Sequence, residues 1–334
     1  MSLTRMLALA MSLLIVMASA FAHGQDSSGK KEKQASSEDK KQEEDDPNAG
    51  RAVLWTEPAD IETRDLFRGP GDAPDPSDKF TFIRRDPGGT SEKIIVEDSK
   101  GRKWKVKFGP EARPETAASR LVWAAGYHVD QTFFVKRAHI EGRGGFDIWD
   151  VRFERNDDGF KNLAPWSWRS NKFAGTRELN GLKTLMALIN NWDIKDENNK
   201  IVRPNKESGL DRSLRIYYVG DLGGTLGATG NGLRKIPGFS NLPAGSKGKP
   251  ADFAAQPLIA GVVNGEVVFN YKGKNSEALK GIPVEHARWM GNLMGRLSDK
   301  QLGDAFRAGG FTESETETYV KALRSRIRQL QELK

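Results

Sequence analysis

The chain has 334 residues, no cysteine and a formal net charge of +7 at pH 7. The lack of cysteine excludes disulfide bonds, a thiol nucleophile and a lipoprotein anchor, so the fold has to rest on core packing, which a chain of this length can provide. The positive charge suits anionic partners such as nucleotides, phosphorylated substrates or acidic envelope polymers. Since no basic stripe is interleaved with aromatic residues, nucleic acid is not an expected partner.

Residues 1–22 have the pattern of a secretory signal peptide. Arg5 supplies the positive start, residues 7–17 form an apolar run, and Ala20 and Ala22 match a small-residue cleavage site. The apolar run is short for a membrane span, and an uncleaved anchor is the alternative interpretation. We therefore expect an exported protein, periplasmic or secreted, with no membrane span after cleavage.

Residues 23–50 are predicted to be a disordered, charged tether. Between positions 23 and 48 the chain has five lysines, eight acidic residues and hardly any apolar side chain. Such a segment cannot bury enough apolar surface to offset the entropy that it would lose on ordering. Because the tether is net acidic, the part of the chain that follows it is more basic than the whole.

Residues 51–158 are expected to form a strand-rich lobe. Short runs of β-branched and aromatic residues predict strands at residues 80–84, 93–96, 104–108, 131–136 and 146–153. Good turn sequences separate the first three, which favours antiparallel pairing. A helix is predicted over residues 114–126, with Pro114 in its first turn and Gly126 at its end.

From about residue 160 the pattern is mainly helical, which predicts a second lobe over residues 159–334. Helices are expected at residues 179–189, 284–297, 298–308 and 312–333. The last two begin with capping-box sequences at Ser298 and Thr312. A buried strand is expected at 214–219, a hairpin turn at Asn264-Gly265, and long loops at 220–232 and 236–250. A strand-rich half before a helical half predicts two lobes with a cleft between them.

The polar motifs fall where the second half begins. Asp193 precedes Asn198 by five positions, and Asp221 follows the predicted strand at 214–219 in the sequence Asp-Leu-Gly. A metal ion that bridges nucleotide phosphates needs hard oxygen ligands, which an Asp and an Asn can supply from separate loops. The other Asp is then left to orient an attacking hydroxyl. Either loop alone could be an ordinary polar turn. The prediction of a metal–nucleotide site therefore depends on the occurrence of Asp193, Asn198 and Asp221 in this order.

The chain resembles the protein-kinase-like superfamily, and most closely its atypical branch of HipA-type and phosphatidylinositol kinases. An uncharacterised group of bacterial proteins in this branch is similar in three motifs, which read here Gly88-Gly89-Thr90-Ser91, Lys105-Val106-Lys107 and Asp193-Ile194-Lys195-Asp196-Glu197-Asn198. The resemblance covers roughly residues 80–230. It implies an α+β, two-lobed protein-kinase-like fold, with an antiparallel-sheet N-lobe that contains one helix and a mainly helical C-lobe.

The resemblance also implies a role for each polar residue of the second half. Asp193 would orient the attacking hydroxyl, and Lys195 would neutralise charge on the transferring phosphoryl group. Asn198 and Asp221 would hold Mg²⁺ or Mn²⁺. For Lys195, a solvated loop lysine is an equally good interpretation.

In the first half, the resemblance implies that Lys107 contacts the phosphates of ATP and pairs with Glu115, near the start of the predicted helix. Glu111 is a competitor for this pairing. Lys105 should point to the same face of its strand as Lys107, because side chains alternate along a strand. The residues that would lie over the phosphates are Gly88, Gly89, Thr90 and Ser91, although a plain hairpin turn explains them nearly as well.

The expected activity is metal-dependent transfer of the γ-phosphoryl group of ATP to a hydroxyl acceptor that the sequence does not identify. An exported kinase lacks its obvious donor, because there is little ATP outside the cell. Two alternatives therefore stay open. One is a catalytically inactive, kinase-like module that binds an anionic ligand outside the cytoplasm, and the other is a structural envelope protein.

Overall fold

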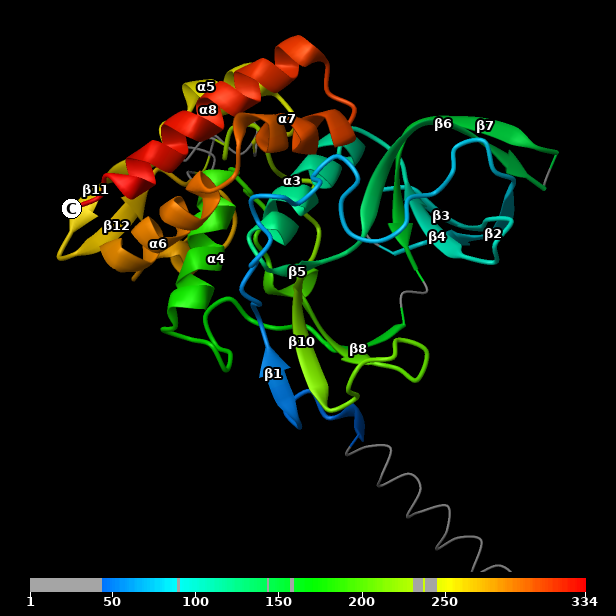
Figure 1. Cartoon of the computed structure of the whole chain (residues 1–334), viewed down its shortest axis with the longest axis horizontal. Helices are drawn as coiled ribbons and strands as arrows, with labels where there is room; N and C mark the ends of the chain where they lie inside the picture. The colour runs from blue at the N-terminus through cyan, green and yellow to red at the C-terminus, as the bar shows by residue number, and fades with distance from the viewer. Residues whose placement is uncertain (1–43, 89–90, 143, 157–158, 231–236, 238–244) are drawn as a thin grey trace, which may run out of the picture. The chain divides into compact units, whose positions relative to one another are not determined.

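The computed structural model describes residues 44–88, 91–142, 144–156, 159–230, 237 and 245–334. The predicted signal peptide and nearly all of the predicted tether lie outside these residues. The chain divides into two units at residues 49 and 50, and every helix and strand named here belongs to the unit Gly50–Lys334 (Figure 1). Within the described part of the chain, no helix has both the length and the apolar character that a membrane span requires.

Five strands close into a barrel in the order β2-β3-β4-β7-β6. They are β2 (Phe80–Asp86), β3 (Lys93–Glu97), β4 (Lys103–Lys107), β6 (Thr132–Glu141) and β7 (Phe146–Arg155). All five strands were predicted, and β2, β3 and β4 are antiparallel neighbours as expected. A parallel pairing of β2 with β6 closes the barrel. Trp104, Phe133 and Phe153 are buried inside it, which gives the barrel its own hydrophobic core.

Helix α3 (Ala112–Ala124) follows β4 and packs against β6 and β7. The predicted helix is confirmed, although it begins two residues before Pro114. The chain leaves the helix at Gly126, whose φ is +89° and where a Cβ would lie 2.2 Å from the Thr56 carbonyl oxygen. A side chain at this position would therefore clash as well as strain the backbone.

A second sheet contains five short strands, of which the sequence predicted only one. They are β1 (Arg51–Val53), β5 (His128–Val129), β8 (Phe160–Ala164), β9 (Lys200–Pro204) and β10 (Leu214–Val219). Strand β10 has exactly the predicted bounds, and it pairs in parallel with β1 and β5 and antiparallel with β9. The sequence analysis did not predict β8 and β9, which lie on either side of α4 (Arg177–Leu188) in the part of the chain expected to be mainly helical and pair with each other.

The remaining helices are α4 (Arg177–Leu188), α5 (Pro250–Ala255), α6 (Val284–Gly295), α7 (Asp299–Ala308) and α8 (Glu313–Gln331). Both predicted capping boxes, at Ser298 and Thr312, are present. The predicted hairpin is formed by β11 (Ile259–Val263) and β12 (Glu266–Phe269), with positive φ at both Asn264 and Gly265. Helix α5 was not predicted; it begins at the last residue of an expected loop. The described residues also form the 3₁₀ turns η1 (Asp196–Asn198) and η3 (Ser276–Leu279).

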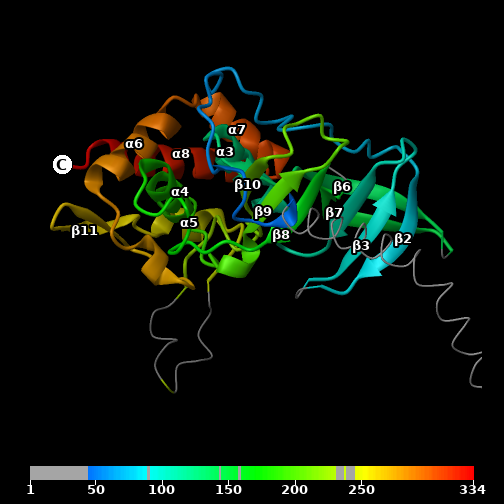
Figure 2. The same cartoon turned by 90° about the horizontal axis from the view of Figure 1, so that it is seen from below.

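The largest hydrophobic cluster joins α3 to helices α4, α6, α7 and α8 and to the inner face of β10. Figures 1 and 2 both show strands β2 and β3 of the barrel on the opposite side of β10 from helices α4 and α6. The end of β4, the start of α3 and the end of β10 therefore come together, and these are the places where the sequence puts Lys107, Glu115 and Asp221.

Candidate functional site

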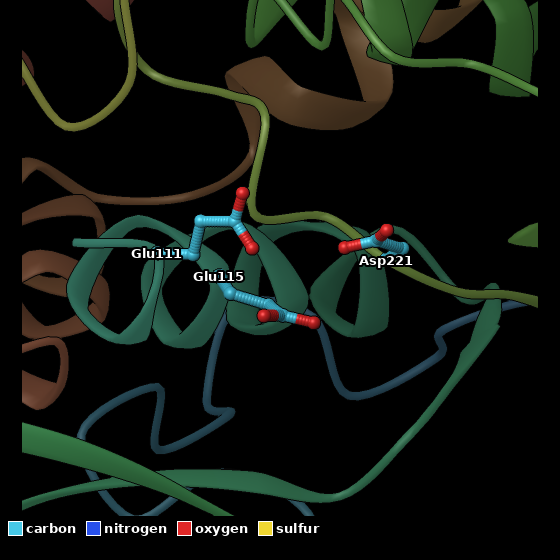
Figure 3. Close-up of side chains that lie close together, drawn as sticks. All are labelled: Glu111, Glu115 and Asp221. Atoms are coloured by element: carbon cyan, nitrogen blue, oxygen red, sulfur yellow. The ribbon is translucent and has the colours of Figure 1, made fainter. Parts of the chain in front are cut away.

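A cluster of ion pairs forms where β4, α3 and the loop after β10 meet. The Lys107 Nζ atom lies 2.6 Å from Glu111 Oε2, 3.1 Å from Glu115 Oε2 and 3.2 Å from Asp221 Oδ1. Lys107 and Glu115 are buried, whereas the Asp221 side chain is 42% exposed. Figure 3 shows the three carboxylates gathered beside helix α3. The sequence left open whether Glu111 or Glu115 pairs with Lys107, and the structure brings both to it.

The geometry of α3 explains why both glutamates reach the same lysine. Glu111 is the N-cap of the helix and Glu115 follows it by four positions, so the two side chains lie on one face. Gly223, two residues after Asp221, allows the loop to pack closely, since a Cβ there would lie 2.8 Å from the Glu111 Cβ. The missing side chain at Gly223 thus lets the loop that carries Asp221 approach the start of the helix.

Two further charged residues of the site, Arg152 and Glu154 on β7, were missed by the sequence analysis. The Arg152 guanidinium donates to Glu115 and to Glu154, and Glu154 Oε1 lies 2.9 Å from Lys105 Nζ. In the register of the sheet, Arg152 faces Lys107 and Glu154 faces Lys105. Charged residues at alternate positions of two strands were the available signal, but only the register shows that they are partners.

The pKa values of the cluster follow from burial and from these contacts. Burial alone would lower the pKa of Lys107, but Glu115, Asp221 and Glu111 raise it above its ordinary value, so the ammonium group stays charged. Burial raises the pKa of the Glu115 carboxyl group, whereas Arg152 and Lys107 oppose this shift. For Glu111, hydrogen bonds from Lys107 and Lys247 outweigh the effect of burial and lower the pKa to about 2.

The segment that contains Asp193 is held by its own polar groups. The Asn198 Nδ2 atom donates to the Asp193 carbonyl oxygen at 2.9 Å, and Trp192 N donates to Gly224 O at 2.9 Å. The first bond uses the nitrogen of the Asn198 amide, so its oxygen is the atom that could bind a metal ion. The second bond joins the segment to the loop that carries Asp221. The φ of Asp221 is +49°, an uncommon value for a residue other than glycine.

The Asp193 carboxylate contacts two lysines. Its Oδ2 atom lies 3.2 Å from Lys195 Nζ and its Oδ1 atom lies 2.9 Å from Lys274 Nζ. Oδ1 is buried and has no partner with hydrogen-bond geometry in the described part of the chain. Burial would lower the pKa of Lys195, but the hydrogen bond and the charge of Asp193 raise it.

A cavity of about 420 Å³ brings most of the predicted site residues together. Its lining includes Ser91, Lys107, Glu115, Asp193, Lys195, Asn198 and Asp221. Lys105 also lines the cavity, so Lys105 and Lys107 of β4 both face it, as the alternation of side chains predicts. The cavity thus contains oxygen donors suited to Mg²⁺ or Mn²⁺ and ammonium groups suited to phosphates.

The predicted phosphate loop is described only in part. Ser91 lines the cavity, and Gly88 N donates to Asp86 Oδ1 at 3.2 Å. Gly89 and Thr90 lie outside the described residues. Lys93, on the strand that follows, donates to the Gly88 carbonyl oxygen and lines the same cavity.

No protein-family model and no curated protein sequence matches the chain. Among solved structures, the chain is similar to the proinflammatory kinase CtkA of Helicobacter pylori, with a TM-score of 0.44 and 12% identity over 77% of this chain and 97% of that chain. It is also similar to the Rio2 kinase of Chaetomium thermophilum, solved as an ADP/Mg²⁺-phosphoaspartate complex, with a TM-score of 0.30 and 13% identity over 75% of this chain and 72% of that chain. Both similar structures are kinases.

Proposed function

We propose that the chain is a two-lobed, protein-kinase-like phosphotransferase that moves the γ-phosphoryl group of ATP to a hydroxyl with the help of Mg²⁺ or Mn²⁺. Residues 51–158, with the barrel and α3, would be the N-lobe, and residues 159–334 the C-lobe. The main support is the ion cluster that Lys107, Glu115 and Asp221 form from three separate stretches of the chain. Asp193 and Asn198 line the same cavity.

In this proposal, Lys107 binds the phosphates of the nucleotide. Glu115 and Arg152 hold it in place, because both are buried and Arg152 donates to the second oxygen of Glu115. The Asp221 carboxylate and the Asn198 amide oxygen would hold the metal ion, which neutralises charge on the phosphates when it is bound. Asp221 would then exchange its contact with Lys107 for a contact with the metal.

Asp193 orients the acceptor. Its buried Oδ1 atom contacts the Lys274 ammonium group but has no partner with hydrogen-bond geometry among the described residues, so it can accept the proton of an acceptor hydroxyl. Lys195 lines the cavity beside it and would offset negative charge on the phosphoryl group during transfer. Gly88 and Ser91 would approach the phosphates together with Gly89 and Thr90, as the family resemblance implies.

Placement in the HipA-type and phosphatidylinositol-kinase branch is part of the proposal, and rests on the sequence motifs. Export to the periplasm or the cell exterior is proposed from the N-terminal sequence pattern. The second candidate function, a catalytically inactive module that binds an anionic ligand, is favoured by that pattern, since ATP is scarce outside the cell. The cationic side chains of the cavity suit such a ligand too, among them Lys93, Lys105, Lys107, Arg152, Lys195 and Lys200.

The proposal is tested with purified protein, labelled ATP and a thermal shift assay. Mg²⁺–ATP should raise the Tm of the wild-type protein and of Asp193→Ala, but not that of Asp221→Ala, which lacks a proposed metal ligand. Phosphoryl transfer should be lost in both variants. Asp211→Ala is the matched control, because Asp211 is exposed and bonds to Ser213 in a turn.

Three outcomes separate the proposed functions. If Asp193→Ala and Asp221→Ala transfer the phosphoryl group as fast as the wild-type protein, the catalytic assignment is contradicted. Stabilisation by envelope polyanions, but not by Mg²⁺–ATP, supports the inactive binding module. A structural envelope protein predicts no ligand effect and no change on Asp221→Asn.

A further inference from the structure

Two ammonium groups converge on the single carboxylate of Asp193. Lys195 reaches Oδ2 from within the same segment, and Lys274 reaches Oδ1 from a segment far along the chain. One carboxylate balances only one of these charges, so the pair leaves positive charge beside the oxygen that is proposed to orient the acceptor. An ammonium group that is partly withdrawn from water gains from a second anionic partner.

Lys274 is held in this position by its backbone and by its neighbours. Its N–H donates to the Trp192 carbonyl oxygen at 2.8 Å, and the Asn275 Nδ2 atom donates to Ile194 O at 3.1 Å. A Cβ at Gly273 would lie 2.5 Å from the Trp192 carbonyl oxygen, so the two segments touch through their backbones. The position of Lys274 next to Asp193 is therefore built into the fold.

Lys274 and Lys195 differ in what else they lie against. Lys195 lines the cavity that contains Lys107 and Asp221, whereas Lys274 is not among the described residues that line it. Lys274 instead lies over the ring of Trp192, 5.7 Å from the ring centroid. Lys195 is thus placed for the phosphoryl group, whereas Lys274 contacts the same Asp193 carboxylate beside Trp192 and is free of that role.

The Asp193 side chain is mostly withdrawn from the surface. The Asp193 side chain is 16% exposed, whereas Lys274 is 52% exposed. The segment of Lys274 lies against Asp193 through a backbone bridge and the Lys274–Asp193 ion pair, and the Tyr271 hydroxyl donates to the Lys274 carbonyl oxygen at 3.1 Å. A small molecule reaches a carboxylate that is withdrawn in this way more easily than the side chain of a folded protein does.

We infer that the acceptor is a small hydroxyl compound that carries a phosphate or carboxylate group, and that Lys274 binds this group while Asp193 orients the hydroxyl. The inference rests on the proposed phosphotransferase function. During transfer, the acceptor oxygen would form a bond to the γ-phosphorus, the bond from this phosphorus to the bridging oxygen would break to release ADP, and the hydroxyl proton would pass to Asp193. The anionic group takes no part in this step and serves binding alone.

The first test measures binding without nucleotide, so that it does not depend on phosphoryl transfer. Calorimetry compares glycerol with glycerate and glycerol 3-phosphate, and myo-inositol with myo-inositol 1-phosphate. In at least one of these sets, a charged member should bind about tenfold more tightly than its neutral partner, the effect of one charged hydrogen bond. Lys274→Gln should remove the difference. Lys280→Gln should keep it, because Lys280 is an exposed lysine that pairs with Glu277.

The second test measures transfer from Mg²⁺–ATP to the same compounds and to a serine peptide with acidic flanks. Lys274→Gln should raise the KM for the charged acceptor about tenfold without a matching rise in the KM for ATP, a separation that general damage to the fold would not produce. The inference is overturned if charged and neutral members bind equally, or if no charged member binds. It is also overturned if the preference for charged members survives in Lys274→Gln. A peptide that is the better acceptor overturns the assignment to a small molecule.

The two proposals fail in different ways. If the phosphotransferase proposal is wrong, Mg²⁺–ATP should not raise the Tm of the protein, whether or not the charged acceptor compounds bind. If only the acceptor inference is wrong, Mg²⁺–ATP should bind in a way that depends on Asp221. Charged acceptor compounds should then bind no better than neutral ones, or their preference should not depend on Lys274.

Discussion

Lys107 Nζ lies 3.2 Å from Asp221 Oδ1, although the two residues are 114 positions apart in the sequence. The contact joins the end of β4 to the loop after β10, and the same ammonium group also contacts Glu111 and Glu115. One buried cation therefore faces three carboxylates. A metal ion that binds the Asp221 carboxylate has to compete with the Lys107 ammonium group for this carboxylate. Binding of a metal ion should therefore change the ion pairs of the cluster, and changes in the cluster should alter metal binding.

Lys107→Met should destabilise the protein and make it respond to divalent cations. The variant removes the cation from three carboxylates whose ligand oxygens lie within 4.8 Å of one another. Removing one partner of a buried ion pair costs about 3–5 kcal/mol, so urea unfolding should show a loss of this order. Mn²⁺ should restore part of the loss by binding the carboxylates.

Lys105→Met is the control for this prediction. Lys105 is a lysine of the same strand, but it is more exposed and pairs with Glu154. Its replacement should cost less and should not increase the response to Mn²⁺. If Mn²⁺ stabilises the wild-type protein and Lys107→Met equally, the lysine does not compete with a cation for these carboxylates.

Glu111→Gln should change the acid stability of the protein. Burial would raise the pKa of Glu111, but Lys107 and Lys247 lower it from 4.5 to about 2. Since the pKa in the folded state lies below that in the unfolded state, the charged glutamate stabilises the fold fully above about pH 4.5, and this stabilisation is lost as the pH falls toward 2. The shift corresponds to roughly 3 kcal/mol.

The measurement is urea unfolding of wild-type protein and Glu111→Gln at pH 6, 4.5 and 3. The difference in the free energy of unfolding should be largest at pH 6 and should shrink below pH 4.5. Glu92→Gln is the control, because Glu92 is exposed and 3.4 Å from Arg85. A difference between wild type and Glu111→Gln that does not vary with pH would contradict the assigned ion pairs.

The sequence predicted the elements whose signal is local. The run of β10, apolar or aromatic except at Arg215, gives a strand with the predicted bounds, because such a run is typical of a strand buried on both faces. The capping boxes at Ser298 and Thr312 mark the starts of α7 and α8 to within one residue, because a capping residue bonds to a backbone N–H three positions on. The order of Lys107, Asp193, Asn198 and Asp221 predicted a common site, and all four line one cavity.

The elements that the sequence missed depend on distant partners. Strand β8 pairs only with β9 among the described strands, and its Lys161 and Asn162 are exposed, so it has no clear alternation of polar and apolar residues. Arg152 and Glu154 join the site through the register of β7 against β4, which no local pattern shows. Lys274 lies in a loop without periodicity, and only the folded chain brings it to Asp193.

Arg326→Met should destabilise the segment that leads to Asp193. Arg326 is buried in α8, and its guanidinium donates to Leu188 O, Asn190 Oδ1, Phe253 O and Gln256 O at 2.7–3.0 Å. The variant leaves these acceptors buried without their donor, at an expected cost of roughly 3–5 kcal/mol in the free energy of unfolding. Hydrogen exchange should increase in residues 188–191. Arg328→Met is the control, since Arg328 is an exposed arginine of the same helix. If Arg326→Met and Arg328→Met have the same free energy of unfolding, the hydrogen bonds of Arg326 do not stabilise this segment.

Gly220→Ala should disturb the proposed metal site without changing any charge. A Cβ at Gly220 would lie 2.3 Å from the Asn198 carbonyl oxygen, so one of the two backbones has to move. Asn198 and Asp221 are the proposed metal ligands, and separating them should weaken the binding of Mg²⁺–ATP about tenfold, which corresponds to about 1.4 kcal/mol. The strain should also cost roughly 1–3 kcal/mol of stability.

Gly261→Ala is the matched control for this change, because a Cβ at Gly261 would meet no atom within 4 Å. Calorimetric titration with Mg²⁺–ATP and urea unfolding separate the effect on the site from the effect on the fold. Nucleotide affinity that is unchanged in Gly220→Ala would mean that the spacing of the two loops does not set the metal geometry. Because Gly220 carries no functional group, a loss of affinity in Gly220→Ala at constant charge would support binding of one metal ion by both loops.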